Sequence, residues 1–177
     1  MSSPRSQLGW TLAESLVTVA LLAVITATAW PSLADLHRTH QVRAVMFELA
    51  THLATARSRS ISHGNPVAMC PSSTANTCTT GRDWTAGWLI YSDPDGNRTP
   101  DTSEDVIASA APASTAGLSV RTTAGRTQVR YGRLGSSLGT NVTFNICHGD
   151  QLGGQVIINM AGRVRSQRPA TPQQCPL

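Results

Sequence analysis

The sequence predicts an α+β protein in which a long N-terminal helix packs on a C-terminal head rich in antiparallel β-sheet. Two observations predict this class: an apolar and then amphipathic helical pattern before Pro66, and short β-branched runs between turn residues after it. The 177 residues include 14 Lys+Arg and 10 Asp+Glu, and 40% of them are hydrophobic. These values exclude a disordered acidic tail, a collagen-like repeat and a protein with many membrane spans.

The predicted helix begins with an uncharged run. No charged residue occurs from Ser15 to Ala34, which is about the length of a membrane-spanning helix. An ordinary secretory signal peptide is the alternative, with cleavage after Ala29. Glu14 argues against it, because a lone carboxylate beside an apolar run is costly and usually has a partner or a task. We therefore expect the chain to span a membrane or to be anchored in one.

The second half of the predicted helix is amphipathic. Its apolar positions recur at helical spacing: Val42, Met46, Leu49 and Leu53. We expect one helix from Trp10 to about Ser62, ended by Gly64 with Pro66 beyond it. Three histidines are expected to be solvated positions of this helix: His37, His40 and His52.

Seven short runs after Pro66 predict strands, which we expect to form two small sheets packed on the amphipathic helix. The runs are Val67–Cys70, Trp84–Tyr91, Val106–Ser109, Leu118–Thr122, Thr127–Tyr131, Val142–Cys147 and Gln155–Met160.

The four cysteines are Cys70, Cys78, Cys147 and Cys175, and they can pair in any of three ways. No two of them have the C-x-x-C spacing that favours a zinc site. We favour two disulfides formed in an oxidising compartment, one closing the loop from Cys70 to Cys78 and one joining Cys147 to Cys175.

The segment before the apolar helix is similar to the class III leader of type IV pilins and type II secretion pseudopilins. A short basic leader ends at Gly9, and the aromatic Trp10 precedes Thr11-Leu12-Ala13-Glu14. Most members of that family have Phe where this chain has Trp10. The resemblance implies that a prepilin peptidase cuts between Gly9 and Trp10 and methylates the new amino terminus. It also implies that Glu14 neutralises the terminal amine of a neighbouring subunit during assembly.

The same resemblance implies four segments along the chain. Residues 1–9 are the leader, 10–30 the transmembrane and fibre-core helix, 31–64 the amphipathic half of the helix, and 65–177 a β-rich head with a basic C-terminal tail. The precursor is expected in the bacterial inner membrane. The processed chain is then expected to join other pilin subunits in the periplasm or in a pilus at the cell surface.

A second resemblance lies in the head. The run from Gly87 to Asn97 resembles the GWxxFxDxDGN signature of the FimT and GspH branch of minor pilins and pseudopilins, with Tyr91 in place of Phe. A calcium loop is the alternative, because Asp93, Asp95, Asn97 and Glu104 imitate its ligand offsets. Arg98 stands where that loop requires glycine, so we interpret the run as a hairpin turn.

Charge is unevenly distributed in the head. Residues 82–105 hold two arginines and six carboxylates, a net charge of −4, whereas residues 106–177 hold seven arginines and one aspartate, a net charge of +6. The positive charge of residues 106–177, the basic half of the head, favours binding to an anionic partner. The alternative is that this charge only keeps the protein soluble.

The basic half contains Gly162-Arg163-Val164-Arg165. In an extended backbone Arg163 and Arg165 point to the same face about 6.5 Å apart, so both can contact the phosphates of one nucleic-acid strand. We expect Gly162 to let the backbone approach that strand closely. The four residues resemble the GRxR motif of the FimT branch, whose members bind DNA during natural transformation. We add Arg168 as a neighbouring contact.

Two functions are consistent with these features. The favoured hypothesis is a FimT-like minor pilin that binds extracellular DNA without sequence preference for uptake in natural transformation. The alternative is structural, a GspH-like pseudopilin of a type II secretion system or a pilus-priming subunit whose arginines face other subunits. The sequence has no nucleophile elbow, phosphate loop or zinc-protease motif, so we expect no enzymatic activity, no cofactor and no metal.

Overall fold

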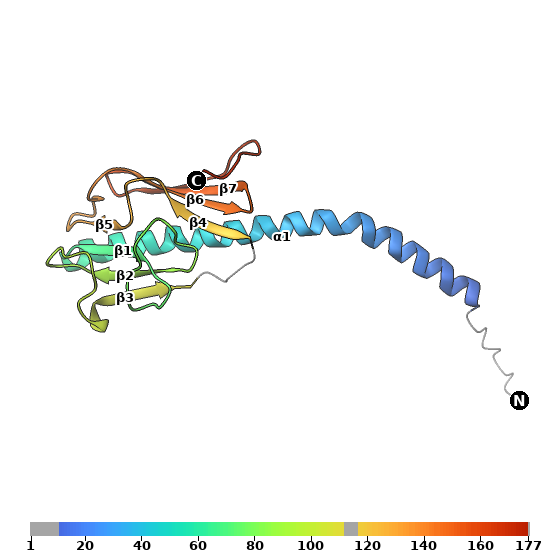
Figure 1. The fold of residues 1–177 in the computed structure, drawn as a ribbon, viewed down its shortest axis with the longest axis horizontal. Coiled ribbons are helices and arrows are strands. Elements are labelled where there is room, and N and C mark those ends of the chain that lie inside the picture. Colours follow the sequence, from blue (N-terminus) through green and yellow to red (C-terminus); the bar gives the residue numbers. More distant parts are fainter. Residues whose placement is uncertain (1–10, 112–116, 177) are drawn as a thin grey trace, which may run out of the picture. The chain divides into compact units, whose positions relative to one another are not determined.

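The computed structural model describes residues 11–111 and 117–176, and Figure 1 shows their arrangement as a long helix and two sheets. The helices are α1 (Leu12–His63) and the short 3-10 helix η1 (Ser103–Asp105). The strands are β1 (Val67–Pro71), β2 (Trp88–Ser92), β3 (Val106–Ala110), β4 (Leu118–Thr122), β5 (Val129–Tyr131), β6 (Val142–His148), β7 (Gln151–Ile158) and β8 (Val164–Gln167).

The helix α1 is continuous through Pro31 and ends at His63, one residue beyond the predicted end. Gly64 follows with a φ of 64°, a left-handed conformation that commonly ends helices and that glycine adopts without strain. The chain divides into two compact units after Arg38. In the first unit the large apolar side chains that the structure describes on the helix are exposed, and α1 has the length and composition to cross a membrane there.

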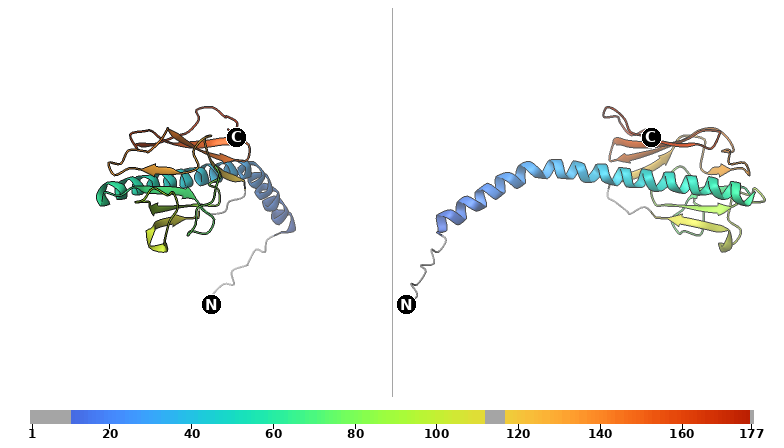
Figure 2. Two further views of the ribbon diagram at one scale, coloured as in Figure 1. Left: turned by 60° about the vertical axis from the view of Figure 1, so that its left-hand side comes forward. Right: turned by 180° about the vertical axis from the view of Figure 1, so that it is seen from behind.

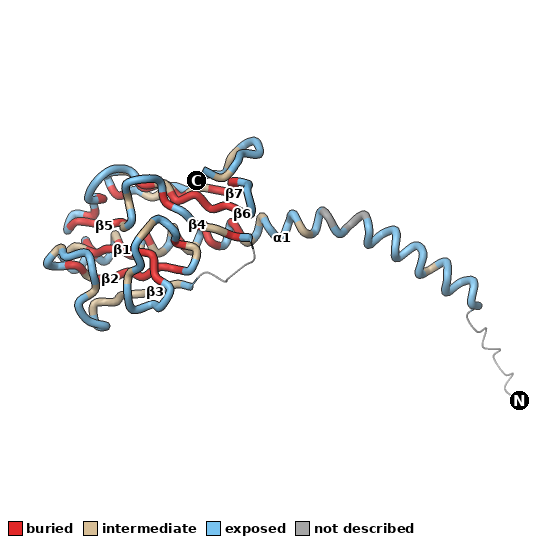
Figure 3. Tube along the Cα trace, viewed as in Figure 1, coloured by how far each residue is buried: buried red, intermediate tan, exposed pale blue. Residues whose placement is uncertain are grey.

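In the second unit, the predicted apolar stripe of α1 forms the centre of the core. Its four members are all buried, as predicted: Val42, Met46, Leu49 and Leu53. Met69 of β1 and Phe144 of β6 belong to the same cluster, so one core joins the helix to both sheets. Figure 2 shows the sheets flanking this half of the helix, and Figure 3 shows that the buried positions gather there.

Both sheets are antiparallel, as predicted. The first sheet has the strand order β3-β2-β1-β5, and the second sheet has the order β4-β6-β7-β8. The edge strand β8 is not among the seven predicted runs. It pairs with β7, and three of its four residues are exposed, so it lacks the apolar alternation that marks a strand in sequence.

The strand predicted over Trp84–Tyr91 is wrong in its first half, because β2 begins at Trp88. Gly87 precedes it with a φ of 131°, and a Cβ at this position would meet backbone oxygens of adjacent segments. Trp84 lies in the loop before this glycine, where its indole packs edge-on against Phe144 with ring centroids 4.9 Å apart. Similarly, β5 begins two residues later than the predicted Thr127.

The strand β7 begins at Gln151, four residues before the predicted run Gln155–Met160. The two glycines Gly153-Gly154 hide this part of the strand from an apolar pattern. A Cβ on either one would meet Val42 or Met46 of the helix. These glycines therefore allow β7 to lie close against α1.

His52 is not simply solvated, which corrects the prediction for this helix position. It is half-buried, and its Nδ1 accepts a hydrogen bond of 2.9 Å from Nε1 of Trp88. The Trp88 side chain is fully buried, so its N–H needs an acceptor inside the protein. His52 thus connects the polar margin of the helix stripe to the first sheet.

Both predicted disulfides are present. Cys70–Cys78 closes the loop that follows β1, and Cys147–Cys175 joins β6 to the C-terminal segment. Each is expected to contribute on the order of 3 kcal/mol by restricting the unfolded chain. The second bond fixes the end of the basic half of the head against the second sheet.

The carboxylate-rich turn is organised around a buried ion pair. Oδ2 of Asp93 accepts hydrogen bonds from Arg130, at 3.1 Å from Nε and 3.0 Å from Nη2. Its Oδ1 accepts from the backbone N–H of Arg98 at 3.2 Å. Asp93 therefore ties the end of β2 to β5, as expected of a residue that shapes a turn.

Replacing Asp93 with Asn should lower the free energy of unfolding by about 3 kcal/mol, because the largely buried Arg130 guanidinium loses its carboxylate. Urea titration of the detergent-solubilised full chain, followed by tryptophan fluorescence, measures this change. Asp95→Asn is the matched control, since Asp95 is exposed and surface substitutions usually change stability by less than about 0.5 kcal/mol. Equal effects of the two substitutions would show that the ion pair does not hold the turn.

Candidate functional site

Arg165 lies in the edge strand β8, and Arg163 immediately precedes this strand. Arg165 is the register partner of Ile157 in β7, and Val164 packs against the core cluster. Because side chains alternate along a strand, Arg165 lies on the face opposite to Val164. The backbone at Arg163 is fixed by Asn159, whose Oδ1 accepts from the Arg163 N–H at 2.9 Å. Both arginine side chains are exposed.

Neither of these two arginines is neutralised within the described part of the chain. The ion pairs found there are Arg38–Asp35 and Arg130–Asp93. Arg163 and Arg165 thus present two unpaired guanidiniums beside each other on one edge. This arrangement can bind an anion by charge-assisted hydrogen bonds.

Arg168 follows β8 at its other end and is also exposed. Its Nε lies 3.4 Å from the carbonyl oxygen of Gly153, which it contacts as a donor. At roughly 3.3 Å per residue, Arg168 lies about 10 Å beyond Arg165 along the chain. We call the three exposed arginines Arg163, Arg165 and Arg168 the basic edge.

The structure shows a packing role for Gly162 that the motif does not predict. Gly162 is buried, has a φ of 76°, and a Cβ there would meet the carbonyl oxygen of Gly135. Its N–H donates to the carbonyl oxygen of Asn159 at 2.8 Å. Gly162 therefore shapes the turn that presents Arg163.

Arg57 is the residue of this site that sequence reasoning missed. Its Nε donates to the carbonyl oxygen of Gly135 at 3.0 Å, and its Nη2 donates to that of Ala161 at 3.2 Å. The helix thus holds the turn before Arg163 in place. No local pattern signals this contact, because Arg57 and Ala161 are 104 positions apart.

A hollow of about 490 Å³ adjoins this turn. It is lined by Ala54, Arg57, Ser58, Ile61, Gly162, Arg163 and Val164. Its wall combines two guanidiniums with apolar side chains, so an anionic group with an apolar neighbour suits it better than a metal ion. In the described residues, no group of three or more His, Cys, Asp or Glu is placed to hold a metal.

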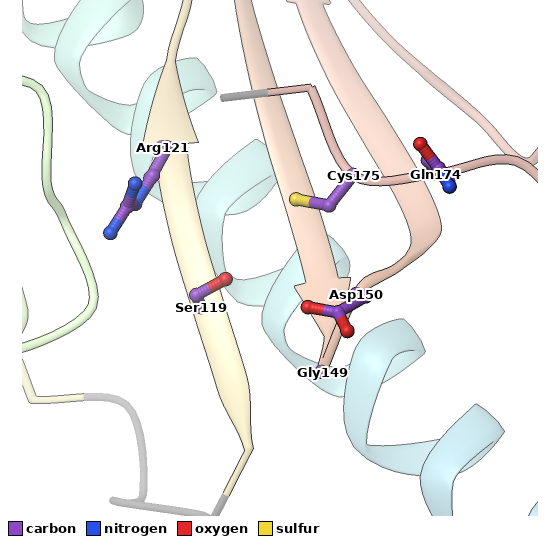
Figure 4. Close-up of a pocket in the computed structure, with 6 residues that line it drawn as sticks. All are labelled: Ser119, Arg121, Gly149, Asp150, Gln174 and Cys175. Atoms are coloured by element: carbon purple, nitrogen blue, oxygen red, sulfur yellow. The ribbon is translucent and has the colours of Figure 1, made fainter.

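A separate hollow of about 380 Å³ lies beside the Cys147–Cys175 bond. Figure 4 shows the residues that line it: Ser119, Arg121, Gly149, Asp150, Gln174 and Cys175. None of the arginines of the basic edge lines this hollow, and its own charged residues have opposite signs. It is therefore a different feature from the candidate site.

The predicted assembly residue Glu14 lies in the first turn of α1 and is exposed. Its backbone N–H donates to Oγ1 of Thr11 at 3.3 Å, so Thr11 caps the helix. The predicted processing residues Gly9 and Trp10 lie outside the described residues.

Solved structures of minor pilins and pseudopilins share this fold. The type IV minor pilin FimU of Pseudomonas aeruginosa strain PAO1 superposes with a TM-score of 0.62 at 17% identity, over 77% of this chain and 95% of FimU. A second crystal form of FimU gives a TM-score of 0.58. The minor pseudopilin EpsH of the Vibrio cholerae Type 2 Secretion System gives 0.52 at 12% identity, over 74% of this chain and 99% of EpsH. The chain has no match among curated proteins.

The sequence match to a known family covers most of the head. Residues 47–162 match the family described as Type II transport protein GspH. The match takes in α1 from residue 47 to its end, both disulfide-bearing strands and the GWxxFxDxDGN-like run, and it ends at Gly162, just before the basic edge. On this match and the shared fold, the chain belongs to the GspH family of minor pilins and pseudopilins.

Proposed function

We propose that the chain is a FimT-like minor type IV pilin whose head binds extracellular DNA for uptake in natural transformation. The observation that carries the proposal is the pair of exposed guanidiniums of Arg165 in β8 and of Arg163 just before it, which no carboxylate of the described chain neutralises. Arginines contact phosphates without regard to base sequence, so the expected ligand is DNA of any sequence.

The surrounding contacts support this assignment. Arg57 and Gly162 hold the turn before Arg163, so the guanidiniums start from a fixed backbone and lose less conformational freedom on binding. The net charge of +6 over residues 106–177 would attract a polyanion over a longer range.

A structural role is the second candidate. Membership of a pilin and pseudopilin family implies association with other pilin subunits. Ile61, Leu134 and Met160 are exposed apolar side chains, with exposed fractions of 52%, 90% and 64%. They favour a protein partner at this end of the head, as in a pseudopilin or a pilus-priming subunit.

Changing Arg163 and Arg165 together to Gln should weaken the binding of unrelated duplexes to a similar degree. The slope of log affinity against log salt should become shallower by about 2, at roughly 0.9 per phosphate contact. Fluorescence anisotropy of labelled duplex with the detergent-solubilised full chain measures both quantities.

The matched control is Arg43→Gln with Arg82→Gln, which removes the same charge from exposed positions that belong neither to β8 nor to the basic edge. An Arg163 and Arg165 variant that binds like this control would remove the main support for DNA binding. A variant that binds DNA normally but fails to enter pili would favour the structural role.

We also propose that a prepilin peptidase processes the chain between Gly9 and Trp10 in the inner membrane. Intact-mass analysis of the membrane-derived protein should then find a chain that begins at Trp10 and carries one methyl group. A chain that begins at Trp30 would instead indicate signal peptidase cleavage after Ala29, and would contradict the pilin leader.

Changing Glu14 to Val should leave the head folded but prevent incorporation into pili. In an apolar fibre core the carboxylate would compensate the terminal amine of a neighbour, which would otherwise be a buried, unpaired charge. Immunoblotting of sheared pili, with Thr18→Val as the control in the same helix, measures incorporation. Normal amounts of the Glu14→Val chain in pili would show that the carboxylate has no such role.

A further inference from the structure

A second group of arginines lies away from the basic edge. Arg98, Arg126 and Arg130 line a hollow of about 310 Å³, together with Gln128 and Leu138. They come from the carboxylate-rich turn, from the loop after β4 and from β5. The fold therefore brings three cationic side chains from separate segments to one concave site.

Each of the three arginines is fixed by a different contact. Arg130 is paired with the buried Asp93. Nη1 of Arg126 donates to the carbonyl oxygen of Thr140 at 2.9 Å. Arg98 has a φ of 69°, and its carbonyl oxygen accepts from Nε2 of Gln128 at 2.9 Å. The side chains of Arg126 and Arg130 and the main chain of Arg98 are thus positioned by contacts within the protein.

The hollow has more positive than negative charge. Asp93 forms its ion pair with Arg130, and among the described residues no carboxylate pairs with Arg98 or Arg126. Asp95 and Asp101 accept hydrogen bonds within the turn and do not line the hollow. Burial and the nearby Arg130 lower the pKa of Arg126 from its ordinary value. Both effects destabilise the charged guanidinium, and a bound anion would stabilise it.

A short loop connects this hollow to the turn that carries Arg163. Oγ of Ser137 accepts from Nη2 of Arg126 at 3.4 Å, and the N–H of Ser137 donates to the carbonyl oxygen of Met160 at 3.0 Å. Arg133, on the same loop, is exposed. Cationic side chains therefore continue from the basic edge across the loop to the hollow.

We infer that Arg98, Arg126 and Arg130 form a second phosphate-binding site, in which Arg98 and Arg126 contact two neighbouring backbone phosphates of the DNA that is bound at Arg163 and Arg165. The inference rests on the proposed function. It extends the DNA contact from one sheet edge to the loop side of β5. Planar guanidiniums suit phosphate oxygens because they donate two parallel hydrogen bonds.

The test compares three double variants of the detergent-solubilised full chain: Arg98→Gln with Arg126→Gln, Arg163→Gln with Arg165→Gln, and the control Arg43→Gln with Arg82→Gln. The probe is a duplex of about 30 base pairs, titrated over a series of salt concentrations. The Arg98 and Arg126 variant should bind roughly tenfold to 100-fold more weakly near 0.1 M salt, with a salt slope shallower by about 2. Combining it with the Arg163 and Arg165 changes should reduce the slope by about 4.

Arg126 also donates a hydrogen bond to the main chain, so its replacement can disturb the fold as well as the binding. Arg98→Gln alone separates the two effects. The Arg98 side chain is exposed, so this variant should fold normally while the salt slope still decreases by about 1. If the Arg98 variants bind like the control while the Arg163 and Arg165 variant is weakened, the second site is refuted and the proposed function stands. If the wild-type chain does not bind the duplex, the proposed function fails and the second site with it.

Discussion

The fold depends on the burial of one stripe of α1 between two sheets. Leu49 and Leu53 are fully buried, and side chains of this kind each contribute about 1.5–3 kcal/mol by leaving water. The first sheet is fixed to the stripe through Trp88 and its hydrogen bond to His52. The second sheet approaches it through the glycines of β7. Since β8 pairs only with β7 in this sheet, the basic edge is positioned indirectly by the same stripe.

Features that depend on local spacing could be predicted from the sequence. The helix stripe, its glycine stop, the antiparallel sheets and the pairing of the four cysteines all follow from neighbouring residues or short separations. The starts of β2 and β7 could not, because glycines there are required by contacts with distant segments. The contact of His52 could not be predicted either, because its partner, the buried indole of Trp88, is 36 residues away in the sequence.

In the candidate site too, some residues could be predicted from local patterns and others could not. A short motif predicts Arg163 and Arg165, and the structure shows that both are exposed, which is what a DNA contact at this strand would require. The packing role of Gly162 could not be predicted, because its close neighbour Gly135 is far away in the sequence. Arg57 was missed because its hydrogen bonds reach two turns that are far away in the sequence. Contacts that position a site are thus harder to predict than the groups that the site presents.

The place of the basic edge in the fold explains why family membership does not decide the function. The family match ends at Gly162, with the last turn that packs against the helix, and the arginines begin immediately after it. On an exposed edge strand, side chains can change without disturbing the core, because three of the four residues of β8 are exposed. The same scaffold can therefore carry different side chains at this edge, so function must be argued from the edge and not from the fold.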